Sequence, residues 1–315
     1  FLIRRIMPLS PDKLTEKILN EPRPLSDRQR RAVLCDRTHI RIIAGAGAGK
    51  TETLTRRIVY LLLVQQVEPS AIVAFTFTEK AAQSMKSRVY ERVKHLGGDE
   101  ICARLGEMFI GTIHGYCYRL LEEHFGYGDW GVLDEKQEMA YLMRVGWALG
   151  LGRSGYYATN CEDFINTLNV YYGEMIPEEA LRKKKDREFL EKLRRYEASL
   201  DQHKRLTFNR MVQLAVENLQ RRPEVAEHVK YLIVDEYQDI NHAQDEIILC
   251  LNYDGLYGIN NINRFLQSGN PNPAITWGVY TYKGGDPVLF YDSERFRPVI
   301  YNNLKGWIRG IDRAR

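Results

Sequence analysis

Short apolar runs alternate with helix-spaced apolar positions along the first third of the chain. The runs Ile40–Ile43, Ala71–Thr78 and Phe109–His114 have the length of buried strands. Between them, apolar residues recur every three or four positions over Leu54–Leu62 and Glu79–Lys94, which predicts two amphipathic helices. This order of elements predicts an α/β domain, in which helices pack on a parallel sheet.

The middle of the chain is mostly helical. Amphipathic patterns over Glu135–Ala148 and Asp186–Leu200 precede the apolar run Tyr231–Val234, which resumes the strand pattern. Beyond residue 251 the chain turns to Gly, Asn, Pro and aromatic residues in short alternating stretches, which predicts a small β-rich module. We therefore divide the chain into an α/β lobe (1–115 and 230–251), a helical insertion (116–229) and the β-rich module (252–315).

The composition narrows the class of protein. The chain has 315 residues, 44% of them hydrophobic, so it can bury a large core, yet no apolar run approaches the roughly 20 residues of a membrane span. The N-terminal residues lack the apolar core and cleavage site of a signal peptide, so we expect a cytoplasmic protein. Five scattered cysteines and seven histidines show no metal-ligand spacing, which favours reduced thiols and no structural metal.

The charge is unevenly distributed. The net charge is +4, but residues 1–60 carry 13 Lys and Arg against 6 Asp and Glu, a balance of +7 that leaves −3 for the remainder. Such a basic stretch suits nucleic acid, although a solvated surface is the commoner explanation of a charge run taken alone. We interpret the basic run Arg182–Lys185 in the same way, as an exposed helix face.

The glycine-rich segment Ala44–Thr51 lies between a predicted strand and a predicted helix. Its backbone N–H groups are therefore placed to surround a polyphosphate at a helix N-terminus, with Lys50 reaching the β and γ phosphates and the Thr51 hydroxyl holding Mg²⁺. A dinucleotide fingerprint starting at Gly45 would need glycine at position 50, and a flexible Gly/Ala turn does not explain the flanking elements. The residues predicted to bind the nucleotide are Ala46, Gly47, Ala48, Gly49, Lys50 and Thr51.

Two carboxylates follow the apolar run Tyr231–Val234 directly. A carboxylate at the end of a buried parallel strand can hold Mg²⁺, and one beside it can take a proton from the attacking water. We assign Asp235 to the metal and Glu236 to the general base. A charged loop after a core strand is the alternative, and the presence of the glycine-rich segment disfavours it.

In order along the chain, five blocks resemble the UvrD/Rep type of superfamily 1 helicases: Leu25–Gln29, Ile43–Thr51, Phe75–Ala82, Gly111–His114 and Val234–Asp239. The resemblance implies a RecA-like P-loop lobe with a helical insertion. It also implies that Gln29 reads adenine and thereby selects ATP, and that Gln238 senses the γ-phosphate and acts beside Lys50 and Glu236 in catalysis.

The resemblance further implies contacts to single-stranded DNA from two strand ends. Thr76 and Thr78 would bind the phosphodiester, the Phe77 ring would stack on a base, and Thr112 and His114 would make a second contact. A stacking ring contributes about 1 to 3 kcal/mol without sequence preference, which suits a motor that steps along any sequence. Taken alone, an aromatic residue at a strand end is more often part of the core.

Three departures from the family pattern limit what the resemblance implies. Glu52 stands where many relatives carry an arginine that packs on the adenine, and Thr207–Asn209 replaces a usual Asp-Phe-Asp, which we interpret as structural. After residue 251 no motif III to VI is visible, and the segments that follow resemble the second half of RecD-like helicases with their SH3-like module. We expect stretches to be missing between the two parts, and slow ATP hydrolysis without the second lobe.

These patterns predict an ATP-dependent DNA helicase or translocase that uses Mg²⁺, moves 3′ to 5′ on single-stranded or partly duplex DNA and acts in DNA repair or phage defence. The alternative is a nucleotide-gated DNA-binding or regulatory subunit that works with a nuclease or another protein and does not unwind DNA alone. A GTPase switch is disfavoured, because no guanine-reading Asn-Lys-x-Asp block is present.

Overall fold

The computed structural model describes residues 10–37, 40–45, 47–153, 156–181 and 184–253, and four short strands beyond them. The helices are α1 (Pro11–Asn20), α2 (Asp27–Leu34), α3 (Lys50–Leu63), α4 (Glu79–His95), α5 (Asp99–Arg104), α6 (Ile113–His124), α7 (Glu135–Val145), α8 (Tyr157–Gly173), α9 (Lys184–Gln202), α10 (Phe208–Arg221) and α11 (His242–Tyr253). Short 3₁₀ helices are η1 (Pro69–Ala71), η2 (Leu105–Glu107), η3 (Leu151–Arg153), η4 (Glu178–Ala180), η5 (Pro223–Ala226) and η6 (Tyr237–Asp239). The strands are β1 (Ile72–Phe75), β2 (Phe109–Gly111), β3 (Gly131–Leu133), β4 (Arg205–Thr207), β5 (Tyr231–Val234), β6 (Ala274–Trp277), β7 (Tyr280–Lys283), β8 (Pro287–Leu289) and β9 (Lys305–Trp307).

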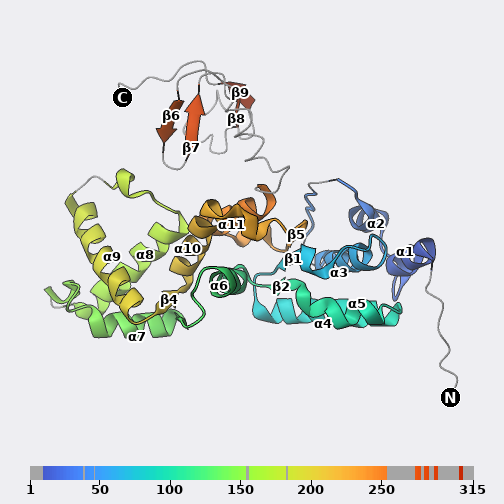
Figure 1. Ribbon diagram of the computed structural model, residues 1–315, viewed down its shortest axis with the longest axis horizontal. Coiled ribbons are helices and arrows are strands. Elements are labelled where there is room, and N and C mark those ends of the chain that lie inside the picture. Colours follow the sequence, from blue (N-terminus) through green and yellow to red (C-terminus); the bar gives the residue numbers. More distant parts are fainter. Residues whose placement is uncertain are drawn as a thin grey trace. The chain divides into compact units, whose positions relative to one another are not determined.

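A parallel three-stranded sheet of order β2-β1-β5 organises the lobe (Figure 1). Side chains alternate across it, so Ile72 and Ala74 of β1 join a core with α1 to α4, while Val73 and Phe75 join a second core with α6, α10 and α11. Both faces are therefore covered by helices, as a parallel sheet requires. The sequence prediction of an α/β lobe is confirmed.

The segment Ile40–Ile43, predicted as a strand, has no sheet partner among the described residues. Its backbone is irregular, and the Ile43 side chain is 86% exposed. This prediction is wrong in the structure, because an apolar run becomes a strand only where a neighbouring strand takes its hydrogen bonds, and Arg41 interrupts the run. The strand predicted over Phe109–His114 is shorter than expected, since the chain enters α6 at Ile113.

Residues 10–24 contain α1, for which the sequence pattern predicted no element. Ser10 caps this helix by accepting a hydrogen bond from the Lys13 backbone at 3.4 Å, and Pro11 stands at the first helical position. Ser26 caps α2 in a reciprocal box with Gln29. In α1, Pro11 therefore marks the start of the helix.

The chain divides into two compact units, Phe1–Met175 with Lys192–Asn252, and Ile176–Glu191 with Tyr253–Arg315. In the second unit β6 pairs with β7 and β8 with β9, both antiparallel, where the sequence predicted a small β-rich module. Most of residues 252–315 lie outside the described residues, and of the segments that resemble RecD-like helicases only the parts within β8 and β9 are described. No helix in the described part of the chain is long and apolar enough to span a membrane.

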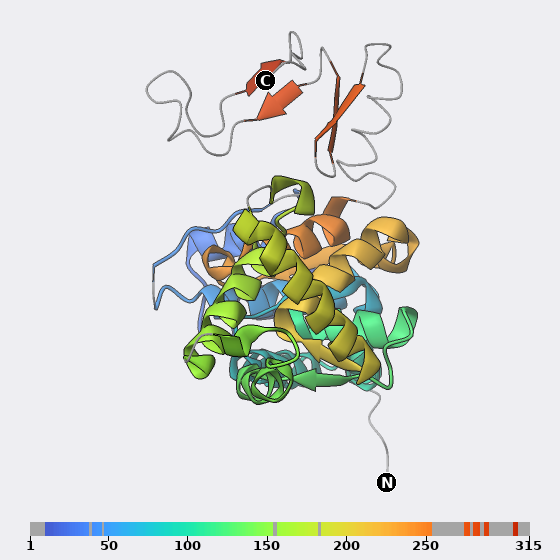
Figure 2. The ribbon, with the colours of Figure 1, turned by 90° about the vertical axis from the view of Figure 1, so that its left-hand side faces the viewer.

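The helices between β2 and β5, where α8 packs against α7 and α10, face the viewer in Figure 2. Several polar side chains are buried among them. The Tyr196 hydroxyl donates to Glu138 at 3.1 Å, and the Tyr172 hydroxyl donates to Glu197 at 2.8 Å. Arg210, 8% exposed, pairs with Asp201 at 2.7 Å. The buried groups among these, the two tyrosine hydroxyls, Glu138 and Arg210, thus each have a partner, as burial of polar groups demands.

Glu138 makes the stability of these helices depend on pH. Burial raises its pKa to about 6, despite the hydrogen bond from Tyr196, and the nearby charge of Glu135 adds to the rise. The folded state therefore favours the protonated carboxyl, so stability is greatest below the unfolded pKa of 4.5 and falls as pH rises through about 6.

We expect Glu138→Gln to raise the free energy of unfolding by up to about 2 kcal/mol at pH 7 and to change it little at pH 4.5, because the amide never ionises. Urea unfolding at the two pH values measures this difference. The exposed neighbour Glu135→Gln is the matched control and should shift both curves only slightly. An equal effect of both substitutions at pH 7 would contradict the burial argument.

Candidate nucleotide and DNA site

The glycine-rich loop leads directly into α3, which begins at Lys50. Gly47 and Gly49 have φ angles of 73° and 81°, a left-handed conformation that side chains disfavour. A β-carbon at position 49 would also lie 2.7 Å from the Gln29 amide nitrogen. The loop therefore needs glycine at both positions, while Ala46 lies outside the described residues.

The structure brings three predicted catalytic side chains together. Lys50 Nζ lies 3.0 Å from Glu236 Oε2, and Gln238 Nε2 donates to the same oxygen at 2.6 Å. Hydrogen bonds from Gln238 and Lys50 lower the pKa of Glu236, so the carboxylate is ionised near pH 7. Glu236 itself has a φ of 54°, a conformation uncommon outside glycine that turns the chain directly after β5.

Asp235 lies at the end of β5, where its backbone N–H donates to the Phe75 carbonyl of β1 at 2.9 Å. Burial and the charge of Glu236 raise the pKa of Asp235, and a hydrogen bond with the Thr51 side chain opposes the rise. A carboxylate and a hydroxyl thus meet beside the glycine-rich loop. This all-oxygen pair fits Mg²⁺, which prefers oxygen ligands and keeps several waters.

Gln29 joins α2 to the glycine-rich loop. Its Nε2 donates to the Ala48 carbonyl at 3.1 Å, while its Oε1 accepts from the backbone and hydroxyl of Ser26 at 2.9 and 3.0 Å. Both lone pairs of the amide oxygen are therefore in use, and one N–H remains for a base. A bidentate contact to adenine would require Gln29 to release Ser26.

Two neighbouring arginines of α3 donate hydrogen bonds to backbone carbonyls of α1 and α2. Arg56, 2% exposed, donates to the carbonyls of Ile18 and Leu19 in the last turn of α1, each at 3.0 Å. Arg57 donates to the Val33 carbonyl near the end of α2 at 2.7 Å. A cation at a helix C-terminus satisfies its free carbonyls and opposes the helix dipole, so α3 caps both helices.

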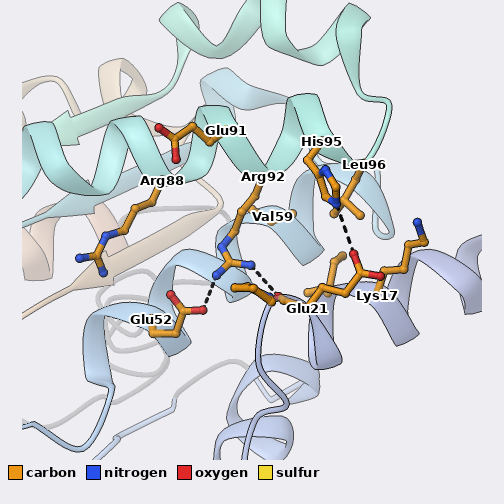
Figure 3. Close-up of a pocket in the computed structure, with 11 residues that line it drawn as sticks. Lys17, Glu21, Glu52, Val59, Arg88, Glu91, Arg92, His95 and Leu96 are labelled. Carbon is orange, nitrogen blue, oxygen red and sulfur yellow. Dashed lines mark hydrogen bonds and ion pairs between the residues drawn. The ribbon is translucent and has the colours of Figure 1, made fainter.

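Glu52 binds two guanidinium groups, one from α3 and one from α4. Its Oε1 accepts from Arg56 at 2.7 Å and from Arg92 of α4, and Arg92 also donates to the Glu21 carbonyl at 2.9 Å (Figure 3). Burial alone would raise the pKa of Glu52, but the two arginines outweigh it and lower the pKa. Glu52 and Arg92, with other residues of α1, α3 and α4, line a cavity of about 600 Å³.

The residues predicted to contact DNA lie at the ends of β1 and β2. Thr76 is buried and its hydroxyl donates to the Thr78 carbonyl at 3.1 Å, whereas Phe77 is 64% exposed. Thr78 caps α4 by accepting from the Ala81 backbone at 3.1 Å. The exposure of Phe77 excludes the interpretation of this ring as part of the core.

The second predicted DNA contact surrounds the start of α6. Thr112 caps this helix by accepting from the Gly115 backbone at 3.1 Å, and its hydroxyl donates to Glu79 at 2.8 Å. The His114 ring packs against Phe208 at a centroid distance of 5.3 Å, and burial lowers the pKa of His114, so the imidazole is neutral near pH 7.

Three residues that support the site were not assigned from the sequence. Glu79 was interpreted only as a helix start, although it follows Thr78 in the same block. Arg56 and Arg92 had no local signal, because their acceptors are backbone carbonyls and a glutamate from other helices. Only the spatial arrangement identifies such partners.

A glycine-rich loop opening a helix, beside two carboxylates at the end of a parallel strand, defines a P-loop nucleotide-binding lobe. Residues 25–259 match the UvrD/REP helicase N-terminal domain, and the chain belongs to this family.

Several DNA helicases are similar to the chain. The ATP-dependent DNA helicase UvrD1 of Mycobacterium tuberculosis is 34% identical over 238 residues, which cover 70% of this chain and 29% of that protein. DNA helicase II of Escherichia coli is 28% identical over 277 residues, covering 77% of this chain and 36% of that protein. The chain therefore spans about a third of the length of these relatives.

We expect Glu52→Ala to lower the free energy of unfolding by about 1 to 3 kcal/mol, because it leaves the buried Arg56 without its charged partner. Urea unfolding at pH 7 measures the loss. Glu100→Ala, which removes an exposed carboxylate of α5, is the control and should change stability by less than about 0.5 kcal/mol. Equal stability of the two variants would show that the pair contributes nothing.

Proposed function

We propose that this chain is the ATP-binding lobe of a DNA helicase or translocase that uses Mg²⁺ and moves 3′ to 5′ on single-stranded DNA, with a role in DNA repair. The observation that carries the proposal is the contact of Lys50 with Glu236, two residues 186 positions apart that lie 3.0 Å from each other beside the glycine-rich loop. Membership of the UvrD/REP family supports the same conclusion.

Each polar group near the loop has a distinct role in this proposal. Thr51 and Asp235 would hold Mg²⁺, which neutralises charge on the phosphates when it is bound. Glu236, which is ionised near pH 7, would accept a proton from the attacking water, and the hydrogen bonds that lower its pKa would weaken it as a base until they open. Gln238 donates a hydrogen bond to the Glu236 carboxylate. The ion pair between Glu236 and Lys50 must break when Lys50 binds phosphate oxygens.

The DNA would cross the ends of β1 and β2. Phe77 offers an exposed ring for stacking, and Thr78 and Thr112 lie at helix N-termini, where backbone N–H groups and the helix dipole favour phosphate. The His114 ring is neutral and packs against the Phe208 ring, so we propose that His114 positions Phe208.

We also propose the domain boundaries expected from the sequence, with residues 116–229 inserted between the two halves of the lobe. The parallel pairing of β1 with β5 supports this division, because the two strands flank the insertion in sequence and adjoin in the sheet.

Gln29 favours ATP as the nucleotide. A strand-displacement assay on substrates with 3′ or 5′ tails would test both DNA unwinding and its polarity. Displacement only with an added protein would favour a regulatory subunit.

We expect Lys50→Ala and Glu236→Gln in the full-length protein to lower DNA-stimulated ATP hydrolysis by at least about 100-fold, because they remove phosphate binding and the general base. A steady-state phosphate-release assay measures the rate. Glu227→Gln, an exposed glutamate ahead of β5, is the control and should retain normal turnover. Unchanged turnover in either site variant would refute the assignment.

We expect Phe77→Ala to weaken single-stranded DNA binding by about 1 to 3 kcal/mol, the contribution of one stacked ring, while ATP affinity stays constant. Fluorescence anisotropy with labelled DNA and with labelled nucleotide gives the two affinities. Tyr90→Ala removes another exposed ring, on the side of α4, and should leave DNA binding unchanged. A parallel loss of both affinities in Phe77→Ala would mean that the ring supports the fold.

A further inference from the structure

Glu79 places a negative charge inside the surface proposed to bind DNA. It is exposed at the first position of α4, directly after Thr78, and its Oε1 accepts the Thr112 hydroxyl at 2.8 Å. The same oxygen lies 3.7 Å from the position that a β-carbon on Gly115 would occupy, so the carboxylate stands against the first turn of α6. This side-chain hydrogen bond joins the segments that follow β1 and β2.

The hydroxyl protons of this surface are mostly committed to protein acceptors. A threonine hydroxyl has one proton to donate. Thr76 gives its proton to the Thr78 carbonyl, and Thr112 gives its proton to Glu79. Thr78 accepts from Ala81, and in the described part of the chain no acceptor is recorded for its own proton. Thr112 therefore cannot donate to a phosphate while it is bound to Glu79.

We infer that Glu79 is an internal competitor of the DNA backbone, whose carboxylate holds the Thr112 hydroxyl until a phosphate oxygen replaces it. Binding of DNA then exchanges one acceptor for another at Thr112 and releases the first turn of α4 from α6. The inference rests on the proposed function, because it needs DNA at this surface. A contact that must be exchanged limits affinity, which suits a protein that has to release each phosphate as it moves.

Glu79→Gln tests the competition, because glutamine keeps the length and the acceptor oxygen but loses the charge. We expect it to tighten single-stranded DNA binding about threefold at low salt, the effect of removing one like charge at an exposed site, and the gain should shrink as salt is raised. Glu91→Gln makes the same charge change on α4, three turns away, and is the matched control. An equal gain in both variants would overturn the inference in favour of a net-charge effect.

A double-mutant cycle separates competition at Thr112 from general repulsion. Thr112→Val removes the hydroxyl, and a thermal melt reports whether α6 tolerates the loss of its cap. If Glu79 acts through Thr112, Glu79→Gln tightens binding less in the Thr112→Val background than in the wild type. The same gain in both backgrounds would overturn the inference.

If the Thr112→Val melt shows unfolding, Glu79→Asp replaces it, because the shorter carboxylate keeps the charge but withdraws from Thr112. Tighter binding by Glu79→Asp supports competition, and unchanged binding overturns it. If the wild-type protein binds DNA but the variants do not differ from it as expected, only the role of Glu79 is refuted. If neither the wild type nor any variant binds DNA, the proposed function is refuted as well.

Discussion

The parallel pairing of β1 with β5 is the constraint on which the rest of the lobe depends. It joins residues from the two sides of the helical insertion, and its register sets Phe75 opposite Val234. Because parallel strands end at the same edge, Thr76 and Asp235 follow β1 and β5 side by side, and the groups that we propose to face DNA and the phosphates share one rim. The alternation of β1 side chains then divides the apolar residues between two cores.

Much of this arrangement could be predicted because it is local in sequence. The helix predicted over Glu79–Lys94 forms α4 and the run Tyr231–Val234 forms β5, since the spacing of apolar residues within one segment indicates both elements. The strand expected at Ile40–Ile43 depended on a partner that the pattern does not encode. The proximity of Lys50 and Glu236 could be expected, because the two sequence motifs that contain them act on the same phosphate. The hydrogen bond between Thr112 and Glu79 could not, because neither residue type specifies a distant partner.

Glu52 shows how one departure from a family pattern is absorbed by its surroundings. Where an arginine would extend toward a base, this carboxylate binds Arg56 and Arg92. The ion pair of Glu52 with Arg92 joins α3 to α4. Arg56 in turn donates a hydrogen bond to the Ile18 carbonyl near the end of α1. The substitution links the helix of the glycine-rich loop to its neighbours, and any stacking on the nucleobase must come from another side chain.

The pairing of Lys50 with Glu236 also affects how fast a nucleotide is captured. An exposed lysine at the mouth of a phosphate site attracts anions over a Debye length, about 10 Å at 0.1 M salt. Here a carboxylate 3.0 Å away cancels most of that field. If the proposed site binds a nucleotide, its association would then depend on separating this ion pair more than on long-range attraction, and small anions that cannot separate the two charges would be disfavoured.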